Sequence, residues 1–168
     1  MLYAWLLWLL LVTDQDLRNR RVPNWLVLIG AVLGSIALVS ASQPFSIEGF
    51  DAVAGACAGF TFLLVFYVAG LMGAGDVKFA GALGLWVGLQ PLLPIWIGAS
   101  LLAGGHALLW MFLKRWPYFP RLTKAFSGEL SLQHDDTEMR RRQRHIPFAA
   151  YLAIASVGWL VWRNHATF

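Results

Sequence analysis

The stretch Gly73-Ala74-Gly75-Asp76-Val77-Lys78 places an acid and a base between two long apolar runs. A charged side chain at the centre of a bilayer costs about 2.5–3.5 kcal/mol or more, so an acid beside a spanning segment marks a functional site by default. The chain has 168 residues, 58% of them hydrophobic, including nine Trp and eleven Phe. Because soluble domains contain less apolar sequence, we predict an all-α, polytopic membrane protein.

Six apolar runs extend outward from this stretch, and a helix needs about 20 residues to cross the hydrocarbon core. We predict spans at 1–16, 24–40, 52–72, 77–89, 92–113 and 146–162, in a single domain over 1–168 with a polar cytoplasmic loop at 114–145. The first run is short, and it covers about 24 Å only if the helix continues through Asp14 and Asp16.

Glycines repeat at a spacing of four residues in two of the predicted spans. Gly84 and Gly88 follow Asp76, and this spacing lets a neighbouring helix approach closely. Gly55 and Gly59 form the same pattern, although chance in a glycine-rich helix explains this repeat equally well.

The basic residues predict the orientation of the chain. With both termini outside, twelve of the thirteen Lys and Arg residues fall in internal segments, and only Arg163 lies outside. Cytoplasmic loops carry such an excess, so we expect Asp14, Asp16 and Asp76 at the cytoplasmic face. Basic clusters beside apolar spans favour contact with membrane lipids and disfavour nucleic-acid binding. The apolar stretch Met1–Val12 lacks the preceding basic segment and the cleavage site of a secretory signal.

Two carboxylates brought together at a partly desolvated site cannot both ionise comfortably, so one keeps its proton. The ionised carboxylate can take a proton from water while the protonated one polarises a carbonyl, as in aspartic proteases. Asp76 is the first candidate. Gly73 and Gly75 lack a Cβ, so the backbone beside Asp76 can bend sharply and approach a second helix or a substrate strand closely. Its partner is Asp16 or Asp14, and either acid lies at the required face.

Two segments resemble the prepilin peptidase family, and more narrowly the short form that serves tight-adherence (Flp-type) pili. They are Asp16-Leu17-Arg18-Asn19-Arg20-Arg21-Val22-Pro23-Asn24 and the Gly73–Lys78 stretch. The family's patterns are Asp-x(6)-Pro-Asn and Gly-x-Gly-Asp, so the resemblance implies that Asp16, rather than Asp14, is catalytic together with Asp76. Ile146-Pro147-Phe148 is similar to a third family segment, with Ala149 where glycine is usual.

The resemblance implies an aspartic endopeptidase of the bacterial cytoplasmic (inner) membrane that acts without a metal or cofactor. Its partners would be prepilin or pseudopilin substrates with a hydrophobic N-terminal helix, whose short leader is removed at the cytoplasmic face. The chain has one cysteine, Cys57, and no counterpart of the cysteine-rich loop linked to N-methylation in long family members, so we expect no methyltransferase activity. A proton-coupled transporter and a secretion-complex scaffold stay as alternatives, although transporters more often place their acids near the midplane.

Three further residues are expected near the two acids. Pro23 is well placed to begin a helix, and Asn24 either forms a hydrogen bond near the site or caps that helix. Lys78 either pairs with Asp76 or, slightly favoured, contacts headgroups, because residues i and i+2 of a helix do not face each other. His106 is predicted to be packed and hydrogen-bonded, whereas the loop residues His134 and His145 lack metal-ligand spacing.

Overall fold

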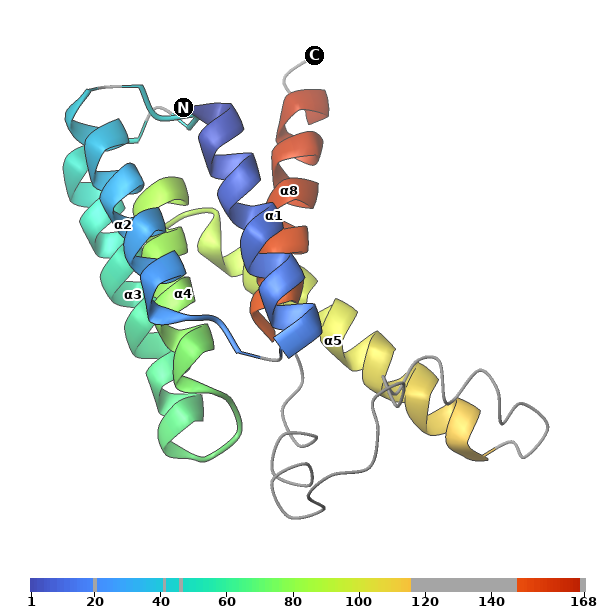
Figure 1. Cartoon of the computed structure of the whole chain (residues 1–168). Coiled ribbons are helices and arrows are strands. Elements are labelled where there is room, and N and C mark those ends of the chain that lie inside the picture. Colours follow the sequence, from blue (N-terminus) through green and yellow to red (C-terminus); the bar gives the residue numbers. More distant parts are fainter. Residues whose placement is uncertain (20, 41, 46, 116–147, 167–168) are drawn as a thin grey trace.

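The computed structural model describes residues 1–19, 21–40, 42–45, 47–115 and 148–166, and within these ranges the chain is all-helical without strands (Figure 1). The helices are α1 (Leu2–Asn19), α2 (Asn24–Val39), α3 (Gly49–Val68), α4 (Ala74–Val87), α5 (Leu92–Arg115) and α8 (Phe148–Ala166). Successive helices run in alternate directions, and both chain ends lie at the same end of the bundle (Figure 1). The predicted all-α class is confirmed.

Two helices are long and apolar enough to cross a membrane, judged by length and composition: α3, and α5 over Leu92–Phe112. Helix α2 is apolar but has 16 residues. Helix α4 has 14 residues and is therefore about 21 Å long, shorter than the hydrocarbon core of about 30 Å. Two candidate spans are thus observed, and the six-span arrangement stays a prediction.

The helix boundaries differ from the predicted spans where glycines or capping contacts act. Helix α3 ends at Val68 rather than near residue 72, because Gly70 adopts a φ of 73°, which interrupts a right-handed helix. Helix α4 begins at Ala74, three residues before the predicted 77, and ends before Gly88, whose φ is 77°. Within the Gly73–Lys78 stretch, Gly73 has a φ of −83°, so the sharp bend predicted beside Asp76 lies instead at Gly70.

Three of the other four helices extend beyond their predicted ends, whereas α2 ends at Val39, one residue before its predicted end. Helix α1 continues past residue 16 to Asn19, so both Asp14 and Asp16 lie inside it. Helix α5 continues to Arg115, and α8 runs from Phe148 to Ala166. Residues 116–145 of the predicted loop, with His134 and His145, lie outside the described residues, as do Ile146 and Pro147.

The most extensive helix–helix interface joins α3 and α4, and glycines line both sides of it. A Cβ placed on Gly55 would lie 2.7 Å from the carbonyl oxygen of Gly84 and 2.6 Å from the carbonyl carbon of Gly88. A Cβ on Gly59 would lie 2.5 Å from the carbonyl oxygen of Ala80. Real Cβ atoms do not approach so closely, so the close approach predicted from Gly84 and Gly88 is confirmed. Of the two explanations left open for Gly55 and Gly59, a packed helix interface is the one observed.

Two buried tryptophans tie α1 and α4 to α2, which sets how these helices are rotated. The indole N–H of Trp8 donates to the carbonyl oxygen of Leu26 at 2.9 Å, and that of Trp86 donates to Gly30 at 2.9 Å. The two indoles stack with ring centroids 6.4 Å apart. A buried indole N–H normally needs such a partner, and these bonds hold the faces that carry Asp16 and Asp76 toward the same interior.

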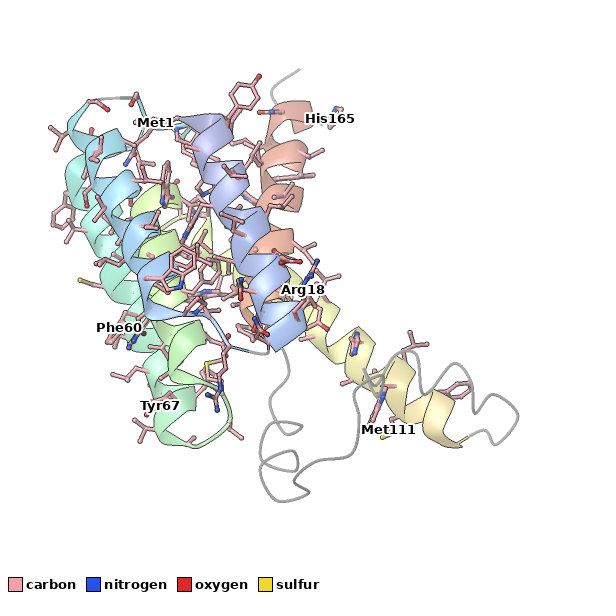
Figure 2. All side chains as sticks on the ribbon, viewed as in Figure 1. Met1, Arg18, Phe60, Tyr67, Met111 and His165 are labelled. Atoms are coloured by element: carbon pink, nitrogen blue, oxygen red, sulfur yellow. The ribbon has the colours of Figure 1, made fainter. Side chains whose placement is uncertain are left out.

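His106 differs from its prediction. It is exposed on α5, with its ring centroid 6.0 Å from that of Tyr151 on α8. The second half of α5 extends away from the other helices, and the labelled Met111 lies on this projecting part (Figures 1 and 2). The packed environment expected for His106 is absent because α5 has left the bundle by this point.

Candidate active site

Asp16 is the last member of a buried stripe along α1, which otherwise consists of Trp5, Trp8, Leu9 and Val12. Positions three and four residues apart share a face of a helix, so this stripe carries the carboxylate into the protein interior. Asp16 is 3% exposed.

Asp14 points elsewhere. Its side chain is 44% exposed and binds Arg18, one turn later in α1, with 2.6 Å between the carboxylate oxygen and Nε. Figure 2 shows Arg18 on the outside of the bundle, near the end of α1. Of the two partners considered for Asp76, only Asp16 is therefore buried.

Asp76 lies in the first turn of α4 and closes that turn on itself. The Gly73 N–H donates to Asp76 Oδ2 at 3.2 Å, and the Asp76 N–H donates to the Gly73 carbonyl oxygen at 3.2 Å. The first amides of a helix have no partner within the helix, and an acid at the third position satisfies one of the groups that precede it. Asp76 is 7% exposed.

Both carboxylates meet the N-terminal turn of a third helix, α8. The Ala149 N–H donates to Asp76 Oδ1 at 3.0 Å, and the Ala150 N–H donates to Asp16 Oδ2 at 2.8 Å. Successive Cα atoms are about 3.8 Å apart, so two acids far apart in sequence converge on adjacent peptide groups. The N-terminus of a helix also favours negative charge.

The environment of Asp76 favours its protonated form. Asp76 precedes the predicted span 77–89, and its burial, together with the nearby negative charge of Asp16, raises its pKa from 3.8 to about 7. The amide N–H groups of Gly73 and Ala149 act in the opposite direction but offset only part of this effect. The arrangement therefore suits a pair of carboxyl groups that holds one proton near neutral pH.

Gly75 brings the α1–α2 connection against the first turn of α4. A Cβ on Gly75 would lie 3.3 Å from both the backbone nitrogen and the carbonyl oxygen of Val22. A close approach is thus observed at this glycine, but the neighbour is Val22 of the connecting segment and not the second helix or substrate strand that was predicted. The next residue, Pro23, is the N-cap of α2, and its carbonyl oxygen accepts from Leu26 at 3.1 Å and from Val27 at 3.3 Å.

Lys78 and Asn24 make a second link between the same two segments. The Lys78 ammonium donates to the Asn24 side-chain oxygen at 2.9 Å and forms no ion pair with Asp76. Because Pro23 is the N-cap residue, Asn24 does not cap α2, and its hydrogen bond close to the two acids is confirmed. The segment that follows Asp16 in sequence is thus fastened to the helix that carries Asp76.

The sequence reasoning missed Ala149 and Ala150, because their contribution is the backbone N–H and not the side chain. A usable signal was present, since a proline near a helix start is followed by first-turn amides that need partners. Over the described part of the chain, no group of three His, Cys, Asp or Glu side chains is placed to bind a metal ion.

Comparison with known proteins identifies the family of this fold. The model of the type IV leader peptidase family matches residues 2–108, which include both acids and all of the α3–α4 interface. The chain belongs to the type IV leader peptidase family. The resemblance to prepilin peptidases is thereby confirmed at the level of the family.

A relative and the solved structures add two findings. The prepilin leader peptidase/N-methyltransferase of Xanthomonas campestris pv. campestris is 31% identical over 165 residues, which cover 93% of this chain and 47% of that protein. The chain therefore spans about half the length of this relative. No solved structure matches the chain.

Proposed function

We propose that this member of the type IV leader peptidase family is an aspartic endopeptidase in which Asp16 and Asp76 are the catalytic pair. The observation that carries the proposal is the convergence of the two buried carboxylates on adjacent amides of α8. A buried acid is costly unless it is bonded or neutralised, and clusters of perturbed carboxyl groups are typical of active sites.

In the proposed reaction, Asp76 holds the shared proton and Asp16 is ionised. The Asp16 carboxylate removes a proton from water, and the resulting hydroxide attacks the carbonyl carbon of the scissile peptide bond. The Asp76 carboxyl group donates its proton to the carbonyl oxygen. As the tetrahedral intermediate collapses, the carbon–nitrogen bond breaks and the proton taken up by Asp16 passes to the leaving amine. One hydroxyl group of the intermediate returns its proton to Asp76 as the new carbonyl forms, which restores the starting pair. No metal or cofactor is needed for this sequence.

The proposed substrates are prepilin or pseudopilin precursors with a hydrophobic N-terminal helix. The activity for which the Xanthomonas relative is named, together with the family match, supports this substrate class. We place the enzyme in the bacterial inner membrane, in contact with lipids through six spans, and the site at the cytoplasmic face. The charge distribution supports this orientation because the excess of Lys and Arg marks the inside. Gly73, Gly75, Pro23, Asn24 and Lys78 then form the substrate-proximal shell.

Two finer assignments complete the proposal. The pattern around Asp16 and Asp76 supports the short, tight-adherence form of the family. The single cysteine, Cys57, lies within α3 and cannot form the paired-cysteine motifs of a zinc site. We therefore propose peptidase activity without N-methyltransferase activity.

The decisive test compares Asp16→Asn and Asp76→Asn with Asp14→Asn, expressed together with a prepilin-like substrate. The first two variants should lower cleavage by about 10²-fold or more, since a positioned acid or base contributes about 10²–10⁴-fold. Asp14→Asn is the matched control and should process normally, because Asp14 is exposed and bound to Arg18. The variants should accumulate in the membrane as the wild type does. Full processing by either of the first two would exclude the aspartyl pair, and a wild type that cleaves no prepilin would favour the transporter or scaffold.

A further inference from the structure

The first turn of α8 forms one hydrogen bond to each of the two acids. The amide of its second residue donates to Asp76, and the amide of its third residue donates to Asp16. The side chains there are small and fully buried, since Ala149 and Ala150 are both 0% exposed. Small residues let the backbone itself come within hydrogen-bonding distance of Asp16 and Asp76.

This contact links α8 to the two helices that carry the acids. Asp16 arrives on α1 and Asp76 on α4, and these helices also meet where the rings of Trp8 and Phe79 lie against each other, tilted by 41° with centroids 5.2 Å apart. A ring contact is weakly directional, whereas a hydrogen bond constrains both the distance and the angle between donor and acceptor. The bonds to successive amides of α8 therefore constrain where the two carboxylates lie.

We propose that the backbone amides of Ala149 and Ala150 are positioning groups of the proposed peptidase, which hold Asp76 and Asp16 at the separation needed to share a water molecule. This inference rests on the proposed function. It assigns the role to the N–H groups and not to the side chains. It also explains why alanine is acceptable at position 149, since any small residue other than proline supplies the same donor.

The sharpest test replaces one N–H at a time by an ester oxygen, with lactic acid incorporated in place of alanine by nonsense suppression. The sites are Ala149 and Ala150, and the matched control is Ala153, which is buried in the same helix and has an ordinary helical amide. All three replacements remove one donor and leave the side chain unchanged.

At positions 149 and 150 the ester should lower prepilin cleavage about tenfold or more, because misplacing a reacting group by about 1 Å can cost about 10²-fold. The pH profile separates positioning from general weakening of the helix. The Ala149 amide favours the charged form of Asp76 and so lowers its pKa, and removal of this donor raises that pKa. The ester at 149 should therefore move the alkaline limb of the profile upward. The ester at 153 should move neither limb.

The proposal is overturned if the esters at 149 and 150 cleave with wild-type rates and pH limits, or if the ester at 153 shifts the limits equally. A measurement without substrate tests the positioning role of the amides independently of whether the protein is a peptidase. Infrared titration of the carboxyl band of Asp76, identified by its loss in Asp76→Asn, should give a higher midpoint in the 149 ester than in the wild type. An unchanged midpoint overturns the positioning role, whatever the substrate. A wild type that cleaves no prepilin while the midpoint shifts would reject the proposed function alone.

Discussion

Helices α4 and α5 follow one another in the chain but have opposite surroundings. Nine of the 14 residues of α4 are buried, from Asp76 near its start to Val87 at its end. In α5, with 24 residues, the buried side chains among residues 92–112 lie in the first half of the helix, and they are Leu92, Ile95, Ala99 and Ala103. Length and apolarity single out α5 as a candidate membrane span, whereas α4, which carries the catalytic candidate, fails that test.

The difference in burial separates a helix that is enclosed by other helices from one whose apolar side chains are largely exposed. Large apolar side chains remain exposed along α5, as at Leu101, Leu108 and Met111, and exposed apolar faces of this size indicate a partner or a lipid environment. The apolar side chains of α4 contact protein instead, with α3 on one side and α2 on another. A helix enclosed by its neighbours can hold an acid in a fixed position, and one exposed to lipid cannot do so as well.

The largest expected difference between the helices concerns leucine side chains. Leu83→Ala in α4 removes a side chain that is 0% exposed and should lower the free energy of unfolding by about 2–5 kcal/mol, because a cavity forms. Leu101→Ala in α5, where the leucine is 71% exposed, should change it by about 0.5 kcal/mol or less in detergent. Denaturant unfolding of the purified variants, followed by tryptophan fluorescence, measures both. Equal losses would show that α5 is also enclosed by protein.

Glycine variants sharpen the same comparison at a smaller scale. A Cβ at Gly84 would overlap the backbone of Gly55, so Gly84→Ala should destabilise the protein by about 1–3 kcal/mol through overpacking. Gly104 in α5 has no atom within 4 Å of the corresponding position. Gly104→Ala should therefore stabilise the helix by up to about 1 kcal/mol through helix propensity. The midpoint of thermal unfolding should fall for the first variant and hold or rise for the second, and a fall in both would contradict the open position of α5.

The smallest expected effect lies at the polar end of α4, where Lys78 binds Asn24. A double-mutant cycle with Lys78→Met and Asn24→Ala should give a coupling energy of about 0.5–1 kcal/mol, since both side chains are exposed. The exposed Asp14–Arg18 pair within α1 is the reference and should give about 0.3–0.5 kcal/mol. Cleavage measured on the same four proteins should fall with the Lys78–Asn24 variants and not with the reference pair. A coupling near zero would mean that this link does not hold α4 against α2.

Much of the fold could be predicted because its causes are local in sequence. Long apolar runs, interrupted at glycine, proline and charged residues, predicted all six described helices. The spacing of Gly84 and Gly88 predicted a close helix neighbour, whereas the same spacing at Gly55 and Gly59 left chance equally open. The boundaries were less accurate near α4. Gly70 and Gly88 adopt positive φ angles that a glycine permits but that its presence alone does not reveal.

The candidate site, like the fold, could be predicted from the sequence only in part. The pattern of residues around Asp16 and Asp76 selected these two acids over Asp14, and the structure buries both while leaving Asp14 in contact with Arg18. The link from Lys78 to Asn24 was not among the alternatives considered for Lys78, because side chains 54 residues apart meet only after α2 and α4 have packed.

By itself, the sequence determined the helical class, the family and the two acids, since these depend on residue type, apolar periodicity and short spacings. Only the tertiary structure decided what the acids bind. Their partners are the backbone amides of Ala149 and Ala150, and every residue except proline carries such a donor. The start of α8 decides which amides lack a partner within the helix. The position of that start relative to α1 and α4 decides which carboxylate reaches each amide. That relation is set by side-chain packing across the whole bundle, and no local stretch of the chain encodes it.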